Sequence, residues 1–254
     1  YMYFSRVCAD LCIRTVQPKL PMPAMNKPIL MRFPLIGEWN TPNTPGSRIP
    51  SHGTNALGTR YAYDFLQLNW KKRGHPCYRS HVLSYLLFGV ALSSCYCYGL
   101  PVYAPCDGRV VYVMDGCRER KRAWFFSDAL MAFKNSRRRQ NQEICEISGN
   151  AVIIQYTDTI YAAFCHLQPN SIAVAVGQYV KAGDFIGSIG HSGNSMFPHL
   201  HFQLMDSADF LHANGLPCAF AQYEVLENGQ WHTVYGGIPT AQQRIRYAPV
   251  DEYV

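Results

Sequence analysis

Two histidines separated by one apolar residue, His199 and His201, open a segment that is predicted as a β-strand. Residues i and i+2 of a strand share one face, so the two imidazoles are expected to leave the sheet side by side. That arrangement suits a metal ligand beside a second working histidine. The alternative is that one histidine fills the core and the other lies at the surface, because short motifs also occur by chance.

One carboxylate, Asp64, lies inside a second predicted strand, residues 60–66. A charge within an apolar strand is costly unless it is paired or bound to a metal. Asp64 is therefore a candidate ligand. The alternative is a solvated aspartate on the outer face of the sheet.

Two further histidines complete a set of five candidates. His166 lies near the end of a strand predicted over residues 160–167, and His52 lies in a polar turn before Asp64. A catalytic zinc ion commonly takes three protein ligands and leaves a fourth position open, and nitrogen with carboxylate ligands suits zinc. The remaining imidazoles can move a proton or stabilise an oxyanion. The set predicts a metal-assisted amide hydrolase that uses zinc-activated water.

The elements that carry these residues are predicted to be mostly β-strands. The chain has 254 residues, of which 48% are hydrophobic and 16% charged, which is typical of one domain or one domain with a small insertion. Glycines recur between short apolar segments over residues 174–187 and indicate tight turns in a β-sheet, without crossover helices. The formal net charge of +6 favours approach to an anionic polymer but is weak evidence alone.

The domain organisation follows from the distribution of prolines and charges. Residues 1–30 are predicted as a leader or loosely ordered arm, without a recognisable secretory signal, and no segment is long and apolar enough to span a membrane. Residues 31–254 are predicted as a β-domain whose first edge strand is residues 33–39. Residues 118–142 are interpreted as a basic helical insertion, either a solvated face or a contact for an anionic partner, and residues 207–254 as a C-terminal extension.

The ten cysteines are too few and too scattered for a disulfide scaffold. Only Cys95 and Cys97 form a close pair, and no second pair at zinc-finger spacing follows. Most cysteines are interpreted as small buried apolar residues. This usage favours a reducing compartment or gives no preference.

Four sequence motifs resemble the lysostaphin/LytM-type zinc endopeptidases, metallopeptidase family 23. The resemblance covers about residues 33–206 and is most specific in its second half. The motifs are Asp64 in Tyr-Ala-Tyr-Asp-Phe, the segment 102–111, Gly149–Ile154 followed by His166-Leu167, and Gly177–Gly187 continuing through Ser192-Gly193-Asn-Ser and Pro198-His-Leu-His-Phe202.

The resemblance implies a small antiparallel β-sheet or barrel-sandwich domain, the duplicated hybrid motif, with a zinc groove that cleaves peptide bonds in peptidoglycan cross-links or stems. It implies zinc binding by Asp64 and His201 and a catalytic pair of His166 and His199. The implied partner is a peptidoglycan peptide and not a nucleic acid. The implied location is the cell envelope or the extracellular space.

One position departs from the family pattern. The first family ligand is a histidine four residues before the aspartate, and that position holds Arg60, which cannot bind zinc. His52, twelve residues before Asp64, is the predicted replacement. Two hypotheses follow: an active zinc endopeptidase that uses His52, or a degenerate member that binds the cell wall or regulates another hydrolase. Retention of the other four residues favours the enzyme.

A third resemblance is to the hairpins of biotin and lipoyl carriers. Residues 177–190 carry Lys181 in strand-like sequence, whereas the carrier lysine sits at the tip of a tight turn. A carrier also gives no reason for the paired histidines, so this alternative is the least favoured.

Overall fold

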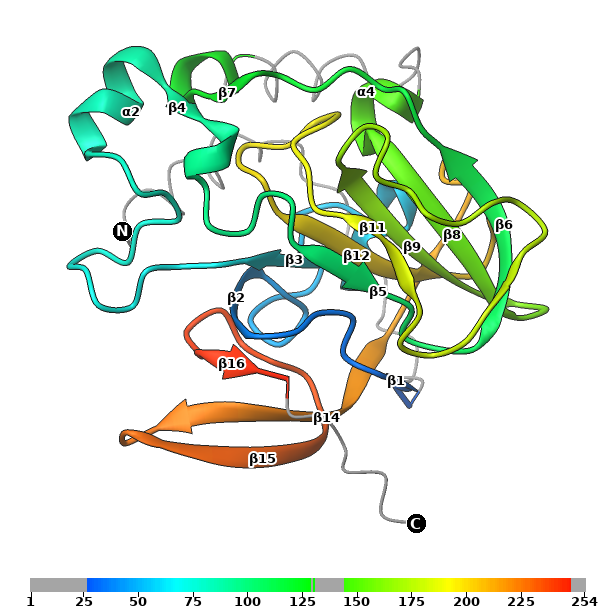
Figure 1. Ribbon diagram of the computed structural model, residues 1–254. Coiled ribbons are helices and arrows are strands. Elements are labelled where there is room, and N and C mark those ends of the chain that lie inside the picture. Colours follow the sequence, from blue (N-terminus) through cyan, green and yellow to red (C-terminus); the bar gives the residue numbers. More distant parts are fainter. Residues whose placement is uncertain (1–26, 129, 131–143, 248–254) are drawn as a thin grey trace, which may run out of the picture.

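The computed structural model describes residues 27–128, 130 and 144–247 (Figure 1). Within these residues the fold is mostly β, as predicted, with one large sheet, two small two-stranded sheets and a few short helices. The strands of the first half are β1 (Ile29–Met31), β2 (Glu38–Asn43), β3 (Tyr63–Leu66), β4 (Val90–Ala91), β5 (Pro101–Tyr103), β6 (Gly108–Met114) and β7 (Arg122–Ala123). Those of the second half are β8 (Asn150–Thr157), β9 (Ile160–Leu167), β10 (Tyr179–Val180), β11 (Phe185–Ser188), β12 (Leu200–Met205), β13 (Gly215–Leu216), β14 (Cys218–Glu227), β15 (Gln230–Gly237) and β16 (Ile245–Arg246). The helical segments are η1 (Ala56–Tyr61), α2 (Val82–Phe88), η2 (Leu92–Ser94) and α4 (Ile144–Ser148).

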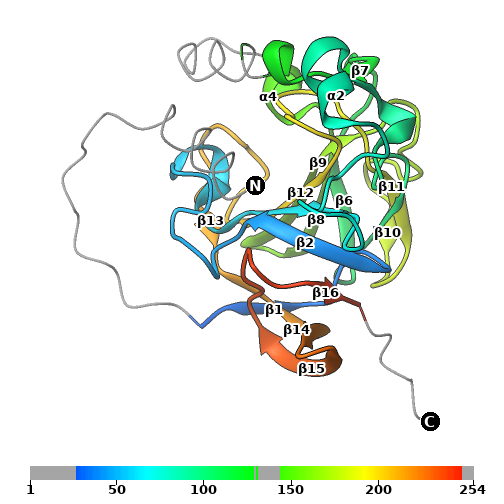
Figure 2. The same ribbon diagram turned by 90° about the vertical axis from the view of Figure 1, so that its left-hand side faces the viewer.

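The large sheet follows the order β1-β14-β16-β2-β3-β12-β9-β8-β6-β10, with β13 beside β12 and β15 beside β14. Its pairings are antiparallel except for β1 with β14, which is parallel. The C-terminal strands thus belong to the same sheet as the strands that carry the candidate residues. In both views β14 and β15 lie at the end of the molecule opposite α2, β7 and α4 (Figures 1 and 2).

The centre of the sheet sets the register of the candidate residues. Strand β12 lies between β3 and β9, with His201 opposite Asp64 on one side and opposite Cys165 on the other. Directly opposite residues of an antiparallel pair present their side chains to the same face. The pairing of β3 with β12 therefore brings His201 and Asp64 together, although 137 residues separate them in the chain.

An aromatic core lies under the sheet and joins its N-terminal and C-terminal strands. The ring of Phe33 lies 5.2 Å from that of Phe65 and 4.9 Å from that of Phe220, both edge-to-face. Phe33 belongs to no strand, so the predicted edge strand at residues 33–39 was wrong; β2 begins only at Glu38. Pro34 lacks the N–H that a ladder needs, and Gly37 has φ of +96°, which a strand does not accommodate.

The first part of the basic insertion lies at the end of the molecule that holds α2 and α4. Strand β7 pairs with β4, and residues 125–128 are helical. The rest of the predicted helix, apart from residue 130, falls outside the described residues. Among the described residues, no helix is long and apolar enough to cross a membrane.

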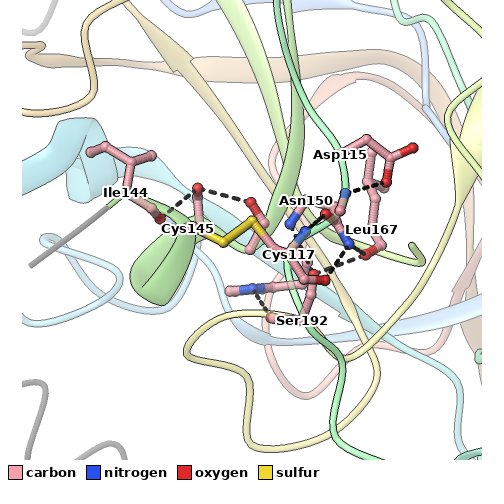
Figure 3. Close-up of a disulfide and its surroundings, with 11 residues drawn as sticks. Asp115, Cys117, Ile144, Cys145, Asn150, Leu167 and Ser192 are labelled. Carbon is pink, nitrogen blue, oxygen red and sulfur yellow. Dashed lines mark hydrogen bonds between the residues drawn. A yellow bond between two sulfur atoms is a disulfide. The ribbon is translucent and has the colours of Figure 1, made fainter. Parts of the chain in front are cut away.

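Six described cysteines are free and buried, which confirms the interpretation of most cysteines as small core residues. Cys165, directly before His166, is one of them. Cys117 and Cys145, however, form a disulfide across the insertion (Figure 3). Disulfides persist mainly in oxidising compartments, so the preference for a reducing compartment does not fit this pair.

Candidate metal centre

His201 and Asp64 form the centre of the candidate site. Nδ1 of His201 lies 2.9 Å from Oδ1 of Asp64, and each residue is only 7% exposed. On the other edge of the ring, Nε2 of His201 lies 2.8 Å from Oε1 of Gln203, whose amide nitrogen donates to the carbonyl of Leu57. Because Oε1 can only accept, the ring proton sits on Nε2. Nδ1 therefore directs its lone pair toward Asp64 and is the atom with which this histidine could hold a metal.

His52 reaches the same carboxylate from the turn before η1. Its Nε2 lies 3.1 Å from Oδ2 of Asp64, and its Nδ1 lies 3.0 Å from Oγ of Ser51. The Ser51 hydroxyl donates to the carbonyl of Thr59, so it accepts from Nδ1. The lone pair of His52 is thus on Nε2, next to Asp64.

Arg60, which occupies the family position of the first ligand, points elsewhere. Its guanidinium donates to Oδ1 of Asn55 and to the hydroxyl of Tyr61. The residue lies at the end of η1, before β3 begins, whereas His52 lies in the preceding turn. The structure therefore places His52, and not Arg60, beside Asp64.

Asn43 is a neighbour of Asp64 that sequence analysis missed. The pairing of β2 with β3 sets Asn43 opposite Asp64, and its side-chain amide donates to Oδ2 over 2.7 Å. Burial alone raises the pKa of Asp64, but the neighbouring histidines outweigh it, His52 first and then His199 and His201, and leave the pKa well below its ordinary value. Asp64 is an ionised carboxylate, the form that a metal ligand requires.

His166 and His199 face each other across the site, with ring centroids 4.8 Å apart. Nδ1 of His166 donates to the carbonyl of Ser192, and Nδ1 of His199 donates to the carbonyl of Phe197. Both rings therefore carry their lone pair on Nε2. Nε2 of His199 lies 3.4 Å from Oδ1 of Asp64.

His166 owes its direction to an irregularity in β9. Its φ is +62°, a left-handed conformation in which non-glycine residues are uncommon. The register of β8 with β9 shifts beside it, between Asn150 and Val152. A bulge of this kind re-aims one side chain of a strand, and bulges are frequent next to active sites.

The environments of the histidines push their pKa values apart. Burial, with the neighbouring His199, lowers the pKa of His166 well below its ordinary value. Burial also lowers the pKa of His52. Burial acts the same way on His199, but the negative charge of the neighbouring Asp64 outweighs it and raises the pKa.

The donor atoms fit a small cation with nitrogen and carboxylate ligands. Two groups have ligand atoms that all lie within 4.8 Å of one another: His52, Asp64 and His201, and His166, His199 and His201. Tetrahedral zinc separates its ligand atoms by roughly 3.4 Å, given bonds of about 2.1 Å. The first group contains the carboxylate and equals the predicted ligand set. The roles of ligand and catalytic residue stay predictions.

The second half of the chain carries a family signature. Residues 131–213, about a third of the chain, match the model described as peptidase family M23. This segment is similar to the M23 peptidases. It includes His166, His199 and His201, whereas His52 and Asp64 lie before it. The support for His52 and Asp64 as site residues therefore comes from the geometry around β3 and not from the family match.

Two relatives from Vibrio cholerae serotype O1 are peptidoglycan DD-endopeptidases by name. ShyC is 30% identical over 100 residues, 39% of this chain and 22% of ShyC. ShyA is 40% identical over 58 residues, 23% of this chain and 13% of ShyA. The chain thus spans less than a quarter of the length of either relative.

Solved structures of peptidases are similar to this chain at low identity. The catalytic domain of lysostaphin from Staphylococcus simulans has a TM-score of 0.35 and 20% identity, over 71% of this chain and 88% of that domain. A zinc-containing peptidase from Vibrio cholerae has a TM-score of 0.31 and 20% identity, over 72% of this chain and 36% of that peptidase.

Proposed function

We propose that this chain is a zinc-dependent endopeptidase that hydrolyses peptide bonds in peptidoglycan cross-links or stems. The observation that carries the proposal is the meeting of an ionised Asp64 with His52 and His201, which supply two nitrogens and one carboxylate. A zinc ion bound there lowers the pKa of a water molecule to about 7 and polarises a carbonyl oxygen.

The roles of the two remaining histidines follow from their hydrogen bonds. His166 and His199 each donate Nδ1–H to a backbone carbonyl, which leaves Nε2 free to take a proton or to donate one to the scissile amide. Once Nε2 of either ring has taken a proton, it can also donate to the oxyanion that develops on a carbonyl under attack. Their carbonyl partners fix the ring orientations before a substrate arrives.

The substrate class and the location rest on the family and on the names of the relatives. ShyC and ShyA are peptidoglycan DD-endopeptidases, so a peptidoglycan peptide is the proposed substrate and the cell envelope or extracellular space the proposed location. The disulfide between Cys117 and Cys145 supports an oxidising location.

Metal content and turnover on one panel of variants test the proposal. The panel contains the unmutated chain, His201→Ala, His166→Ala and the control His75→Ala, which removes an exposed histidine outside the site. Elemental analysis after zinc addition measures binding, and chromatography of digested peptidoglycan fragments measures hydrolysis.

The unmutated chain and His75→Ala are expected to hold about one zinc ion and to release peptide fragments. His201→Ala is expected to lose zinc, and His166→Ala to keep zinc and lose turnover. Stoichiometric zinc without hydrolysis, or no zinc at all, would overturn the peptidase and support the degenerate wall-binding member instead.

A further inference from the structure

A single loop supplies the hydrogen-bond acceptors that orient both facing histidines. Residues 190–198 lie between β11 and β12 and present the carbonyl of Ser192 to His166 and that of Phe197 to His199. Each Nδ1–H bond decides which nitrogen of the ring holds the lone pair. What holds this loop therefore also holds the two histidines.

The insertion holds the loop by its carbonyls. Arg120 donates from Nη1 to the carbonyl of Gly193 over 3.0 Å and from Nη2 to that of Ser195 over 2.5 Å. Asp128, fully buried, lies 3.1 Å from Nε of Arg120 and fixes the guanidinium. A buried aspartate needs such a partner, since an unpaired buried charge is costly. Arg120 and Asp128 are therefore built to face the loop and do not form a solvated basic surface.

His191 continues the chain of contacts from Arg120 toward the site. Its Nε2 lies 3.1 Å from Nη2 of Arg120, which can only donate, and 3.6 Å from Oδ2 of Asp128, beyond hydrogen-bond distance. Nε2 of His191 thus accepts, and its proton is on Nδ1. Nδ1 lies 3.0 Å from Oγ of Ser195.

Ser195 connects His191 to His199 through hydrogen bonds. Its hydroxyl lies 2.5 Å from the carbonyl of Phe197, which can only accept, so the hydroxyl donates there and accepts from His191. Nδ1 of His199 lies 2.7 Å from the same Phe197 carbonyl and 3.1 Å from Oγ of Ser195. Each donor in this series has an acceptor. The hydrogen bonds all run in the same direction, from Arg120 to the Phe197 carbonyl that orients His199.

A second anchor acts on the part of the loop that orients His166. Next to the Cys117–Cys145 disulfide, the side-chain oxygen of Asn150 accepts from the backbone N–H of Cys117, and the backbone N–H of Asn150 donates to Oγ of Ser192 (Figure 3). A Cβ on Gly149 would lie 2.3 Å from that Oγ, so only glycine lets the loop come this close. The loop thus meets Arg120 within the insertion and Gly149 and Asn150 after it.

We propose that Arg120, Asp128, His191 and Ser195 are positioning residues that hold His199, through the carbonyl of Phe197, in the orientation that presents Nε2 to the site. This inference deepens the proposed function and rests on it for its kinetic test. It makes the insertion a structural part of the catalytic centre.

The variants Arg120→Lys and Ser195→Ala test the proposal. Lysine keeps the charge beside Asp128 but cannot bridge the two carbonyls. Arg122→Lys is the matched control, because Arg122 lies two residues away and bonds the carbonyls of Phe88 and Gly89. Ser195→Thr restores the hydroxyl. Zinc content, kcat and KM on a peptidoglycan fragment, and the ¹⁵N imidazole shifts of His199 are measured for each.

Arg120→Lys and Ser195→Ala are expected to lower kcat by roughly 10–100-fold with KM and zinc content unchanged, as for other residues that orient active-site groups. Arg122→Lys and Ser195→Thr are expected to stay near the unmutated chain. An unchanged kcat in both test variants would overturn the inference. If the unmutated chain hydrolyses nothing, the ¹⁵N shifts still decide: protonation of Nδ1 in the unmutated chain, with exchange to Nε2 in the test variants, supports the positioning role. Protonation of Nε2 in the unmutated chain contradicts it.

Discussion

Nε2 of His52 lies 3.1 Å from Oδ2 of Asp64, although twelve residues and the helix η1 separate them in the sequence. The carboxylate thereby has a histidine on each side, because Nδ1 of His201 lies 2.9 Å from its other oxygen. The backbone folds back at this point: the N–H of Ser51 donates to the carbonyl of Arg60. A loop of this shape brings a candidate ligand to Asp64 that a fixed spacing along one strand does not provide.

His52→Ala is expected to lose zinc, whereas Arg60→Ala is expected to keep it. Alanine at 52 removes the nitrogen that faces Asp64, while Arg60 only contacts Asn55 and Tyr61. Elemental analysis of both variants, with melting temperatures to show that each is folded, makes the comparison. Retention of zinc by a folded His52→Ala protein would remove His52 from the ligand set and favour the group formed by the other three histidines.

Gln203→Met is expected to weaken zinc binding by roughly 10–100-fold, because Met cannot accept the Nε2–H of His201 and the ring loses its fixed tautomer. Gln203 is 1% exposed, and Met has a similar length, so the fold should tolerate the change. Competition with a fluorescent zinc chelator measures the affinity. Gln178→Met, on a loop far from His201 in sequence and bonded only to Ala175 and Val110 in the described contacts, is the control. Equal affinities for the two variants would contradict the role of Gln203.

The two strands with alternating or paired polar residues could be predicted because their signal is local. Residues 160–167 were predicted as a strand and form β9, and His201 lies in β12, which begins at Leu200. His199 lies one residue before this strand, so the expected strand covers only the second of the paired histidines. The same logic failed at the start of the second predicted strand: residues 60–62 lie outside β3, which begins at Tyr63. Residues 60 and 61 form the end of η1, where Gly58 lies against the side chains of Gln203 and Met205.

The partners that orient the candidate residues could not be predicted from spacing. Asn43 meets Asp64 through a register shift between β2 and β3, and Arg120 meets the 190–198 loop through contacts more than 70 residues apart. Such contacts depend on the whole topology. A sequence signal did exist for Gln203, which follows His201 at i+2 and so shares its face of the strand.

His166→Gly is expected to be more stable than His166→Ala by about 1 kcal/mol, because φ at this position is +62° and only glycine adopts it without steric cost. Both variants are expected to lose turnover, which separates backbone strain from chemistry. Urea unfolding measures the free energy of each variant. The corresponding pair at His199, where φ is not in the left-handed region, is expected to show alanine as the more stable residue. The same order at both positions would contradict the strain at His166.

Protonation of His191 is expected to lower the free energy of unfolding as the pH falls below about 6.5. Burial lowers its pKa, although the negative charge of Asp128 acts in the opposite direction, so the unfolded chain binds this proton more readily than the folded chain. The contribution of His191 to the free energy of unfolding is therefore fully present above the pKa that His191 has in the unfolded chain. It is lost as the pH drops toward the pKa of the folded chain, by at most about 1.4 kcal/mol per pH unit.

The comparison between the unmutated chain and His191→Asn isolates this proton from those of the other histidines. Urea unfolding from pH 5 to pH 8 is expected to show a smaller loss of stability at low pH in the variant, whatever its absolute stability. Parallel curves for the two proteins would show that His191 does not titrate differently on unfolding.

Loss of the Cys117–Cys145 disulfide is expected to lower the free energy of unfolding by roughly 3.5 kcal/mol, since the bridge closes a segment of 28 residues in the unfolded chain. Urea unfolding of the double variant Cys117→Ser/Cys145→Ser measures this, and a phosphine reductant should shift the unmutated chain to the same midpoint. The reductant should leave the double variant unchanged, because the six described free cysteines are buried thiols with no bond to reduce.

Because Asn150 contacts both Cys117 and Ser192, the double variant Cys117→Ser/Cys145→Ser should also lose turnover at a urea concentration where the sheet is still folded. Parallel loss of turnover and of far-ultraviolet circular dichroism would show instead that the bridge stabilises the domain as a whole and does not hold the loop that orients His166.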